Sequence, residues 1–158
     1  MLVGTKAAER FEAGNGNDTL IGKGGADIYH AGLGNDYIRI HDLNFNLVDG
    51  GEGNGDTLAI AAVDANLDLA KFSGKIMGIE KIYLYGPSGS DSGVTLNANQ
   101  LKALSDTSNK LIVNGNHGDY VHITDHGWQD KGIYHGFHTY TNADAELVVG
   151  INVTVNFI

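Results

Sequence analysis

A nine-residue pattern repeats in strict register near the start of the 158-residue chain. Its intact copies begin at Ala13, Gly22 and Ala31, and they read AGNGNDTLI, GKGGADIYH and AGLGNDYIR. Each copy has glycine at its fourth position, aspartate at its sixth and a large apolar residue at its eighth. A repeat this short, with one large apolar residue in each copy, predicts short strands that stack along the axis of a solenoid.

The eighth positions form an apolar column that extends beyond the intact copies. Counted from Gly4, the column consists of Phe11, Leu20, Tyr29, Ile38 and Leu47. We expect one buried side chain from each strand. The outer copies are degenerate, with Glu9 and Phe45 at the position of the aspartate. Degenerate end copies are expected in a stacked array, because a terminal coil has no neighbour with which to share a metal.

The glycines and aspartates of the repeat fit a calcium-binding turn. A turn that points several carbonyl groups at one ion needs a positive φ angle at some positions, which glycine adopts at little cost. Calcium takes about six to eight oxygen ligands and combines carboxylates with backbone carbonyl groups. A single copy would fit an ordinary turn of a β-protein equally well. Several copies in register, together with the apolar column, favour calcium.

The repeat resembles the calcium-binding β-roll of RTX (repeats-in-toxin) proteins. The resemblance implies a parallel β-roll, or β-solenoid, in which two repeats make one coil, so that alternate turns stack on the same edge. The copy at 49–56, within DGGEGNGDTL, contains one inserted residue. We call the stack of turns over 13–18, 31–36 and 49–56 the first edge, and the stack over 4–9, 22–27 and 40–45 the second edge.

Two calcium sites are expected on the first edge, where Asp36 is shared between them. At most one weaker site is expected on the second edge, at Asp27, because the turn at Gly22 has only degenerate neighbours. The candidate metal-binding residues combine the aspartates with glycines and other residues of the turns. They are Ala13, Asn15, Asp18, Gly22, Gly24, Asp27, Ala31, Gly32, Leu33, Gly34, Asp36, Gly51, Gly53 and Asp56.

After Leu58 the nine-residue period is lost, and alternating strand patterns replace it. The expected strands are Thr57–Val63, Ile79–Tyr85, Lys110–Asn114, Tyr120–Thr124, Gly132–Thr141 and Ala145–Phe157. One short helix is expected over Ala98–Leu104, with Asn97 as its N-cap and Gln100 as the reciprocal partner of the cap.

The chain is therefore predicted to be all-β and to have two parts. Residues 1–58 would form the calcium-binding β-roll, and residues 59–158 a β-rich C-terminal capping module with one short helix. That second part is expected to be either a more irregular solenoid or a small sandwich.

Much of the chain after the repeats resembles the C-terminal region of very large RTX adhesins that are exported by type I secretion. The similar stretches are VDGG at 48–51, DTL at 56–58, GIEKIYL at 78–84, TLN at 95–97, LSD at 104–106, LIVNG at 111–115, GW at 127–128, YT at 140–141 and residues 147–155. The chain departs from the pattern at Asn114, where aspartate is expected, and this argues against a further calcium site in the second half.

This resemblance implies a non-catalytic module that passes unfolded through the type I secretion machinery and folds in extracellular calcium at the bacterial cell surface. Charge supports the folding step independently. Without calcium, stacked turns bring Asp18, Asp36 and Asp56 together with no countercharge, and this repulsion together with the entropy of glycine opposes folding. Because the site exists only in the folded chain, the free energy of calcium binding becomes free energy of folding.

Composition excludes several other classes of protein. The net charge of −9 argues against nucleic acid or an anionic membrane as a partner. The absence of cysteine excludes disulfides and suits an exported protein that does not rely on oxidative folding. No apolar run approaches the length of a membrane span, so membrane insertion is not expected. No signal-peptide pattern opens the chain, which begins in mid-repeat, and we expect a fragment of a longer protein.

Histidines late in the chain raise the alternative of a zinc site. His122 and His126 would share one face only on a helix, whereas Tyr120–Thr124 alternates like a strand. Polar strand and loop histidines are therefore the simpler interpretation. No catalytic constellation is found, and we do not expect an enzyme.

Four late aromatic residues raise the alternative of a surface that stacks on glycans: Trp128, Tyr134, Phe137 and Tyr140. The competing interpretation is the edge of a β-core that these residues shield from water. Besides a folding and secretion module, two functions therefore stay open, namely a ligand-binding adhesin module and an accessory calcium module of an RTX enzyme.

Overall fold

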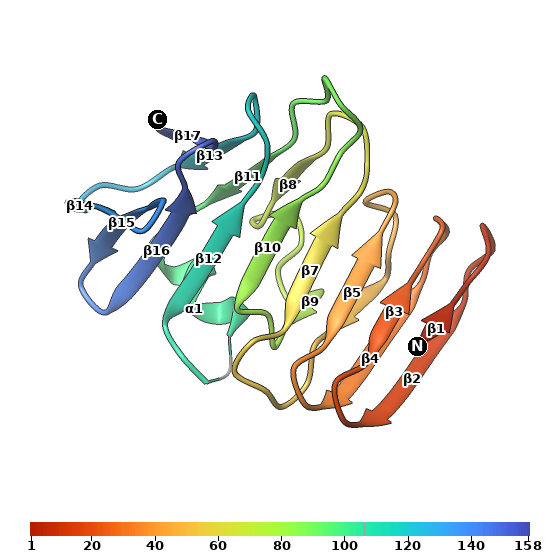
Figure 1. Cartoon of the computed structure of the whole chain (residues 1–158). Coiled ribbons are helices and arrows are strands. Elements are labelled where there is room, and N and C mark those ends of the chain that lie inside the picture. Colours follow the sequence, from red (N-terminus) through yellow and green to blue (C-terminus); the bar gives the residue numbers. More distant parts are fainter. Residues whose placement is uncertain (106) are drawn as a thin grey trace.

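A computed structural model describes residues 1–105 and 107–158. The described residues form three sheets (Figure 1), whose strands follow in spatial order. The nine-stranded sheet contains β1 (Leu2–Val3), β3 (Thr19–Ile21), β5 (Tyr37–Ile40), β7 (Thr57–Ile60), β10 (Lys81–Leu84), β12 (Lys110–Asn114), β16 (Ala145–Gly150), β15 (Phe137–Asn142) and β14 (Gln129–Tyr134). One four-stranded sheet contains β2 (Arg10–Asn15), β4 (Ile28–Leu33), β6 (Leu47–Asp49) and β9 (Ile76–Met77). The other contains β17 (Thr154–Phe157), β13 (Tyr120–Ile123), β11 (Gly93–Leu96) and β8 (Asn66–Asp68).

The repeats form strands that pair in parallel with the strand one coil away. Leu20 of β3 pairs with Ile38 of β5, and Phe11 of β2 pairs with Tyr29 of β4. Strands of the nine-stranded sheet therefore alternate along the sequence with strands of the sheet behind it (Figure 1). At the far end β15 pairs antiparallel with both β14 and β16. The sheet is thus mixed, and its topology alone does not establish a parallel β-roll.

The prediction of a mostly β chain with one short helix is confirmed for the described residues. The helix is α1 (Ala98–Leu104), and both hydrogen bonds of its capping box are present. The Asn97 side chain accepts the Gln100 amide at 2.9 Å, and the Gln100 side chain accepts the Asn97 amide at 2.8 Å. Leu101 and Leu104 are buried. A helix this short depends on such packing, because isolated helices of this length are unstable in water.

The predicted apolar column is correct in the intact repeats and wrong in the degenerate copy that follows. Leu20, Tyr29 and Ile38 are buried at 1% exposure or less. Tyr29 pairs with Val48, however, so Val48 continues the column in place of Leu47. Val48 is completely buried, whereas Leu47 is only partly buried. The coil from Tyr29 to Val48 is one residue longer than the coil from Phe11 to Tyr29. A shift of one residue moves a strand's side chains to the opposite face.

Two strands predicted in the second half are each divided in the structure. The segment predicted as one strand over Gly132–Thr141 is a hairpin of β14 and β15. Its turn contains His135 and Gly136, which both have positive φ angles, as type I′ turns require. The segment Ala145–Phe157 is interrupted after Gly150 and continues as β17 in another sheet. The sequence pattern alone did not reveal these breaks, because residues typical of strands lie on both sides of each turn.

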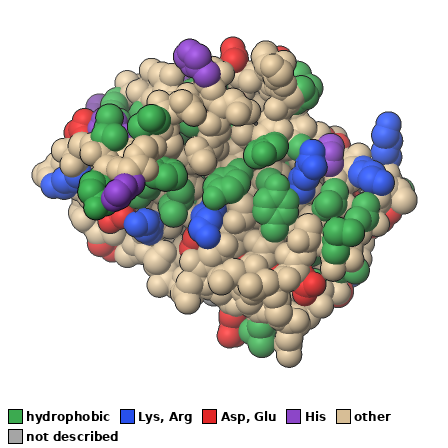
Figure 2. Space-filling model, in the orientation of Figure 1, with side chains coloured by type: hydrophobic (Ala, Val, Ile, Leu, Met, Phe, Trp, Pro, Cys, Tyr) green, Lys and Arg blue, Asp and Glu red, His purple; other side chains and the backbone are tan. Residues whose placement is uncertain are grey.

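The outer face of the nine-stranded sheet is mainly apolar and basic. Figure 2 shows hydrophobic side chains interleaved with Lys and Arg over this face, whereas acidic side chains lie mostly toward its margins. Tyr37 and Arg39 lie on β5, and Tyr83 lies on β10, beyond β7; all three side chains are partly buried. The acidic residues of the repeats therefore gather at the turns and not on the sheet.

The shifted register can be tested by removing side-chain volume at two neighbouring positions. We expect Val48→Ala to lower the free energy of unfolding by about 2 kcal/mol, because it leaves a cavity in the core. Leu47→Ala should lower it by less, although more carbon is removed, because Leu47 is partly exposed. Urea denaturation in saturating calcium measures both values. A larger loss for Leu47→Ala would show that the nine-residue register continues unshifted.

Candidate metal centre

The turns of the first edge stack directly on one another. They connect β2 to β3, β4 to β5 and β6 to β7, and so lie along one margin of the nine-stranded sheet (Figure 1). The Gly16 amide donates to the Leu33 carbonyl at 2.7 Å, and the Gly34 amide donates to the Glu52 carbonyl at 2.9 Å. Each turn is thus hydrogen-bonded through its backbone to the turn one coil further along the chain.

Glycines permit this close stacking. A Cβ atom added to Gly32 would lie 2.0 Å from the Gly14 carbonyl oxygen, and one added to Gly51 would lie 2.1 Å from the Gly32 carbonyl oxygen. A Cβ atom added to Gly53 would lie 2.1 Å from the Gly34 carbonyl oxygen. Any larger residue would push the turns apart. The glycines therefore keep the carbonyl groups of adjacent turns close together, as a shared cation requires.

The aspartates of the first edge form a column. Asp36 Oδ1 accepts the Asp18 amide at 2.6 Å, and Asp56 Oδ1 accepts the Asp36 amide at 2.6 Å. Asp36 is 2% exposed and Asp56 is completely buried. Asp36 and Asp56 therefore lie inside the stack, away from the water that would otherwise solvate their charges, whereas Asp18 is partly exposed and lies 3.6 Å from the N-terminal ammonium group of Met1.

Asp36 occupies the centre of this column and has an unsatisfied oxygen. Its Oδ2 is buried and has no hydrogen-bond partner among the described residues. Burial raises the pKa of Asp36 most, the Asp18 carboxylate raises it further, and the Asp18 amide opposes the shift. Because the folded-state pKa lies above the ordinary value of 3.8, Asp36 lowers the stability of the metal-free fold as the pH rises past that value. A bound cation would supply the missing partner.

The second edge is arranged differently. Asp27 Oδ1 accepts the Glu9 amide at 2.9 Å, and Asp27 Oδ2 accepts the Tyr29 hydroxyl at 2.8 Å. Desolvation is the main cause that raises the pKa of Tyr29, so the hydroxyl keeps its proton and donates it. Both carboxylate oxygens of Asp27 are thus already hydrogen-bonded within the protein.

Residues 3–38 match the family model described as the RTX calcium-binding nonapeptide repeat (4 copies). The chain carries RTX repeats. Such repeats are typical of secreted proteins. Neither a curated protein nor a solved structure matches the chain.

Within residues 1–105 and 107–158, no helix has the length and apolar character needed to span a membrane.

The RTX turns bring most of the predicted ligands of the first edge together. Ala13 and Asn15 lie near the end of β2, and Ala31, Gly32 and Leu33 lie at the corresponding end of β4. The Gly32 carbonyl already accepts the Glu52 amide at 2.8 Å, and the Leu33 carbonyl accepts the Gly16 amide. A carbonyl oxygen has two lone pairs, so each retains one for a metal.

Side chains alone do not complete a metal site in the described part of the chain. No three acidic or histidine side chains there are grouped as metal ligands. A cation between the RTX turns would therefore take most of its ligands from backbone carbonyl groups. Calcium accepts such a set, whereas zinc prefers nitrogen and sulfur ligands.

Glu80 continues the column, although sequence reasoning did not include it. Glu80 Oε2 accepts the Asp56 amide at 2.9 Å, and Glu80 Oε1 accepts the Ser105 hydroxyl at 2.7 Å. Glu80 is 5% exposed. It belongs to the GIEKIYL stretch, but it lies outside the nine-residue period, so spacing gave no signal of its position. The adjoining Asp106, part of the LSD stretch, lies outside the described residues.

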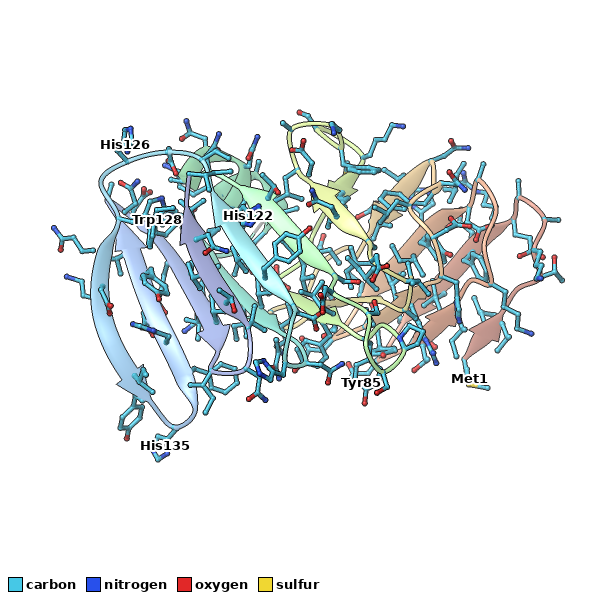
Figure 3. All side chains as sticks on the ribbon, turned by 90° about the horizontal axis from the view of Figure 1, so that it is seen from above. Met1, Tyr85, His122, His126, Trp128 and His135 are labelled. Atoms are coloured by element: carbon cyan, nitrogen blue, oxygen red, sulfur yellow. The ribbon has the colours of Figure 1, made fainter. Side chains whose placement is uncertain are left out.

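The late histidines and aromatic residues lie apart from the RTX turns. His122 is on β13, as the strand prediction required, and its ring lies 4.4 Å from that of Tyr120. Figure 3 shows His126 at a loop and His135 at the tip of the β14–β15 hairpin. A hydrogen bond from His138 lowers the pKa of Asp130 on the neighbouring strand.

The four late aromatic residues do not share one exposed face. Tyr134 is 75% exposed, but Tyr140 is only 7% exposed. Trp128 is partly buried against the core and donates its indole N–H to Asp125 at 2.7 Å. Figure 3 places Trp128 beside the body of the protein, away from the hairpin tip. The structure thus favours shielding of the core at Trp128 and Tyr140.

Removing the central charge of the column should weaken calcium-dependent folding. Asp36→Asn keeps an oxygen that can accept the Asp18 amide but removes a charged ligand. We expect the calcium concentration at the folding midpoint to rise about tenfold or more, because ligand charge tunes calcium affinity. Circular dichroism during a calcium titration measures this midpoint.

The matched control is Glu12→Gln, which removes one negative charge from an exposed residue outside the turns. Its midpoint should stay close to that of the unmodified chain. Equal midpoints for Asp36→Asn and the unmodified chain would remove Asp36 from the ligands.

Proposed function

We propose that this chain is a non-catalytic module of the β-roll type whose folding depends on calcium. The observation that carries the proposal is the column of three aspartates within glycine-rich turns, of which Asp36 and Asp56 are buried. At its centre, Asp36 Oδ2 has no hydrogen-bond partner among the described residues. A buried charge without a partner is costly, and a cation at this edge would remove that cost.

Calcium on the first edge would be held between successive turns. The carboxylates of Asp18, Asp36 and Asp56 would supply the charge, and Asp36 would serve both neighbouring sites. Backbone carbonyl groups would supply the remaining ligands, from Ala13, Asn15, Ala31, Gly32, Leu33, Gly34, Gly51 and Gly53. The ion supplies electrostatic attraction between turns that otherwise repel one another, and it has no catalytic part.

The expected energies suffice to control folding. Extracellular modules bind calcium with dissociation constants of about 10⁻⁴–10⁻³ M. An ion present at ~100 times its dissociation constant adds about 2.7 kcal/mol for each independent site. Small proteins are stable by only about 5–15 kcal/mol in total. Two such sites would therefore decide whether the repeats are folded.

We further propose that the module belongs to an adhesin that is exported by type I secretion, and that it folds after export at the cell surface. RTX repeats are typical of secreted proteins. The resemblance of GIEKIYL and the later stretches to large RTX adhesins supports this origin. A chain that needs calcium to fold would stay unfolded where calcium is scarce, as passage through a narrow export channel requires.

Folding should follow calcium and not divalent cations in general. In chelator we expect far-UV circular dichroism of a largely unfolded chain, and a cooperative gain of β-structure as calcium is added. Magnesium at the same concentrations should not replace calcium, because it demands a tighter octahedral shell. A chain fully folded in chelator would contradict calcium-dependent folding.

Export is tested separately with a passenger protein fused ahead of this chain in cells that carry a type I secretion system. We expect the passenger in the medium when the fusion includes the segment and inside the cells when it does not. Calcium in the medium should change the folding of the exported fusion and not the requirement for the segment. Equal export without the segment would refute the secretion role and leave calcium binding untouched.

A further inference from the structure

The turn over 22–27 on the second edge has the same repeat motif as the turns of the first edge. It differs in the residue that lies two positions after the aspartate. Two positions beyond the aspartate, the first edge has Leu20 and Ile38, whereas the second edge has Tyr29. All three side chains are buried in the apolar column. Tyr29 alone adds a hydroxyl group at this place, and that hydroxyl donates to Asp27 Oδ2 at 2.8 Å.

The Tyr29 ring is held so that its hydroxyl points into the turn over 22–27. The ring stacks on Phe11 with centroids 4.8 Å apart and an interplanar angle of 9°. A Cβ atom added to Gly22 would lie 1.8 Å from the hydroxyl oxygen and 2.7 Å from Asp27 Oδ2. Gly22 thus leaves just enough space for the hydroxyl, which fills the start of the turn beside the carboxylate.

Other groups of this turn are also paired within the protein. The Glu9 amide donates to Asp27 Oδ1 at 2.9 Å. Nδ1 of His41 lies 2.5 Å from the Gly22 carbonyl oxygen, a predicted calcium ligand. The Gly25 amide lies 3.4 Å from Asp42 Oδ2. These contacts come from the coils on both sides, so the turn is held by the same neighbours between which an ion would otherwise lie.

The next coil has no carboxylate in register with Asp27, although its Asp42 carboxylate lies near the Gly25 amide. The Asn46 amide donates to the Asp27 carbonyl at 2.7 Å, which places Asn46, and not Phe45, in register with Asp27. Its neutral side chain donates to the Ala26 carbonyl at 3.0 Å. The carboxylate column of the first edge therefore has no counterpart beyond Asp27 on the second.

We propose that the Tyr29 hydroxyl takes the place of calcium in the turn over 22–27, so that the second edge is metal-free and calcium binds on the first edge alone. The residues of this turn do not fit a calcium site, because the Tyr29 hydroxyl fills the space beside Asp27 Oδ2 and no carboxylate of the next coil lies in register with Asp27. This inference rests on the proposed calcium binding of the first edge. One repeat motif thus builds both a metal-dependent and a metal-free turn, and the residue two positions after the aspartate decides between them.

The test is the number of calcium ions bound to the whole chain, counted by native mass spectrometry after equilibration with calcium. We expect two ions on the unmodified chain. Tyr29→Phe keeps the stacked ring but frees Asp27 Oδ2, and it should bind one ion more. The matched control is Tyr83→Phe, which removes a tyrosine hydroxyl from the outer face of the nine-stranded sheet and should leave the number unchanged.

A third ion on the unmodified chain would overturn the inference, and so would a Tyr29→Phe chain that binds no additional ion. Asp27→Asn gives an independent measurement that does not require a new site to form. It keeps an acceptor for the Glu9 amide, and it should leave the two ions bound, whereas a loss of one ion would place Asp27 among the ligands. A chain that binds no calcium at all would instead refute the proposed function, and the inference with it.

Discussion

Repulsion along the aspartate column is the constraint on which the RTX half of this structure depends. Strands one coil apart in a sheet are about 4.8 Å apart. Two like charges at that distance repel by roughly 3 kcal/mol at an effective dielectric constant of about 20. Asp18, Asp36 and Asp56 meet this repulsion because hydrogen bonds between successive residues fix them in one column. The fold that aligns the turns thus also creates the demand for a cation.

The rest of the chain uses similar hydrogen-bonded ladders with fewer stacked charges. The Ser92 hydroxyl accepts the Ala65 amide at 3.1 Å, and Asp119 Oδ1 accepts the Ser92 amide at 2.8 Å. A neutral hydroxyl therefore takes a place that a carboxylate holds on the first edge. At the end of the aspartate column, Glu80 is likewise followed by the Ser105 hydroxyl. Neutral hydroxyl groups thus take part in the ladders of the C-terminal half, where the first edge has carboxylates.

Local signals in the sequence were reliable where neighbouring residues alone decide the structure. The capping box of α1 joins residues three positions apart, so its pattern predicted the helix and its first residue. The apolar column was predicted correctly while the nine-residue period lasted, and it failed at Leu47 because one additional residue changed the register. The hairpin at His135 and Gly136 was missed because a histidine with a positive φ angle has no reliable signature in a single sequence.

The sequence by itself determined the spacing of the turns, the positions of glycine and aspartate, and the class of cation that such turns suit. Only the tertiary structure decided in which of these turns the carboxylate oxygens are satisfied within the protein. Asp36 and Asp27 occupy the same position of the same repeat, yet one retains an oxygen without a hydrogen-bond partner among the described residues, and the other accepts Tyr29. Glu80 joins the column because its carboxylate accepts the Asp56 amide from one coil away. The sequence places Tyr29 two positions after Asp27, but only the folded chain shows that its hydroxyl points back to the carboxylate. The partner of Asp56 comes from the adjacent coil, and once the coils differ in length no repeat period specifies such a neighbour.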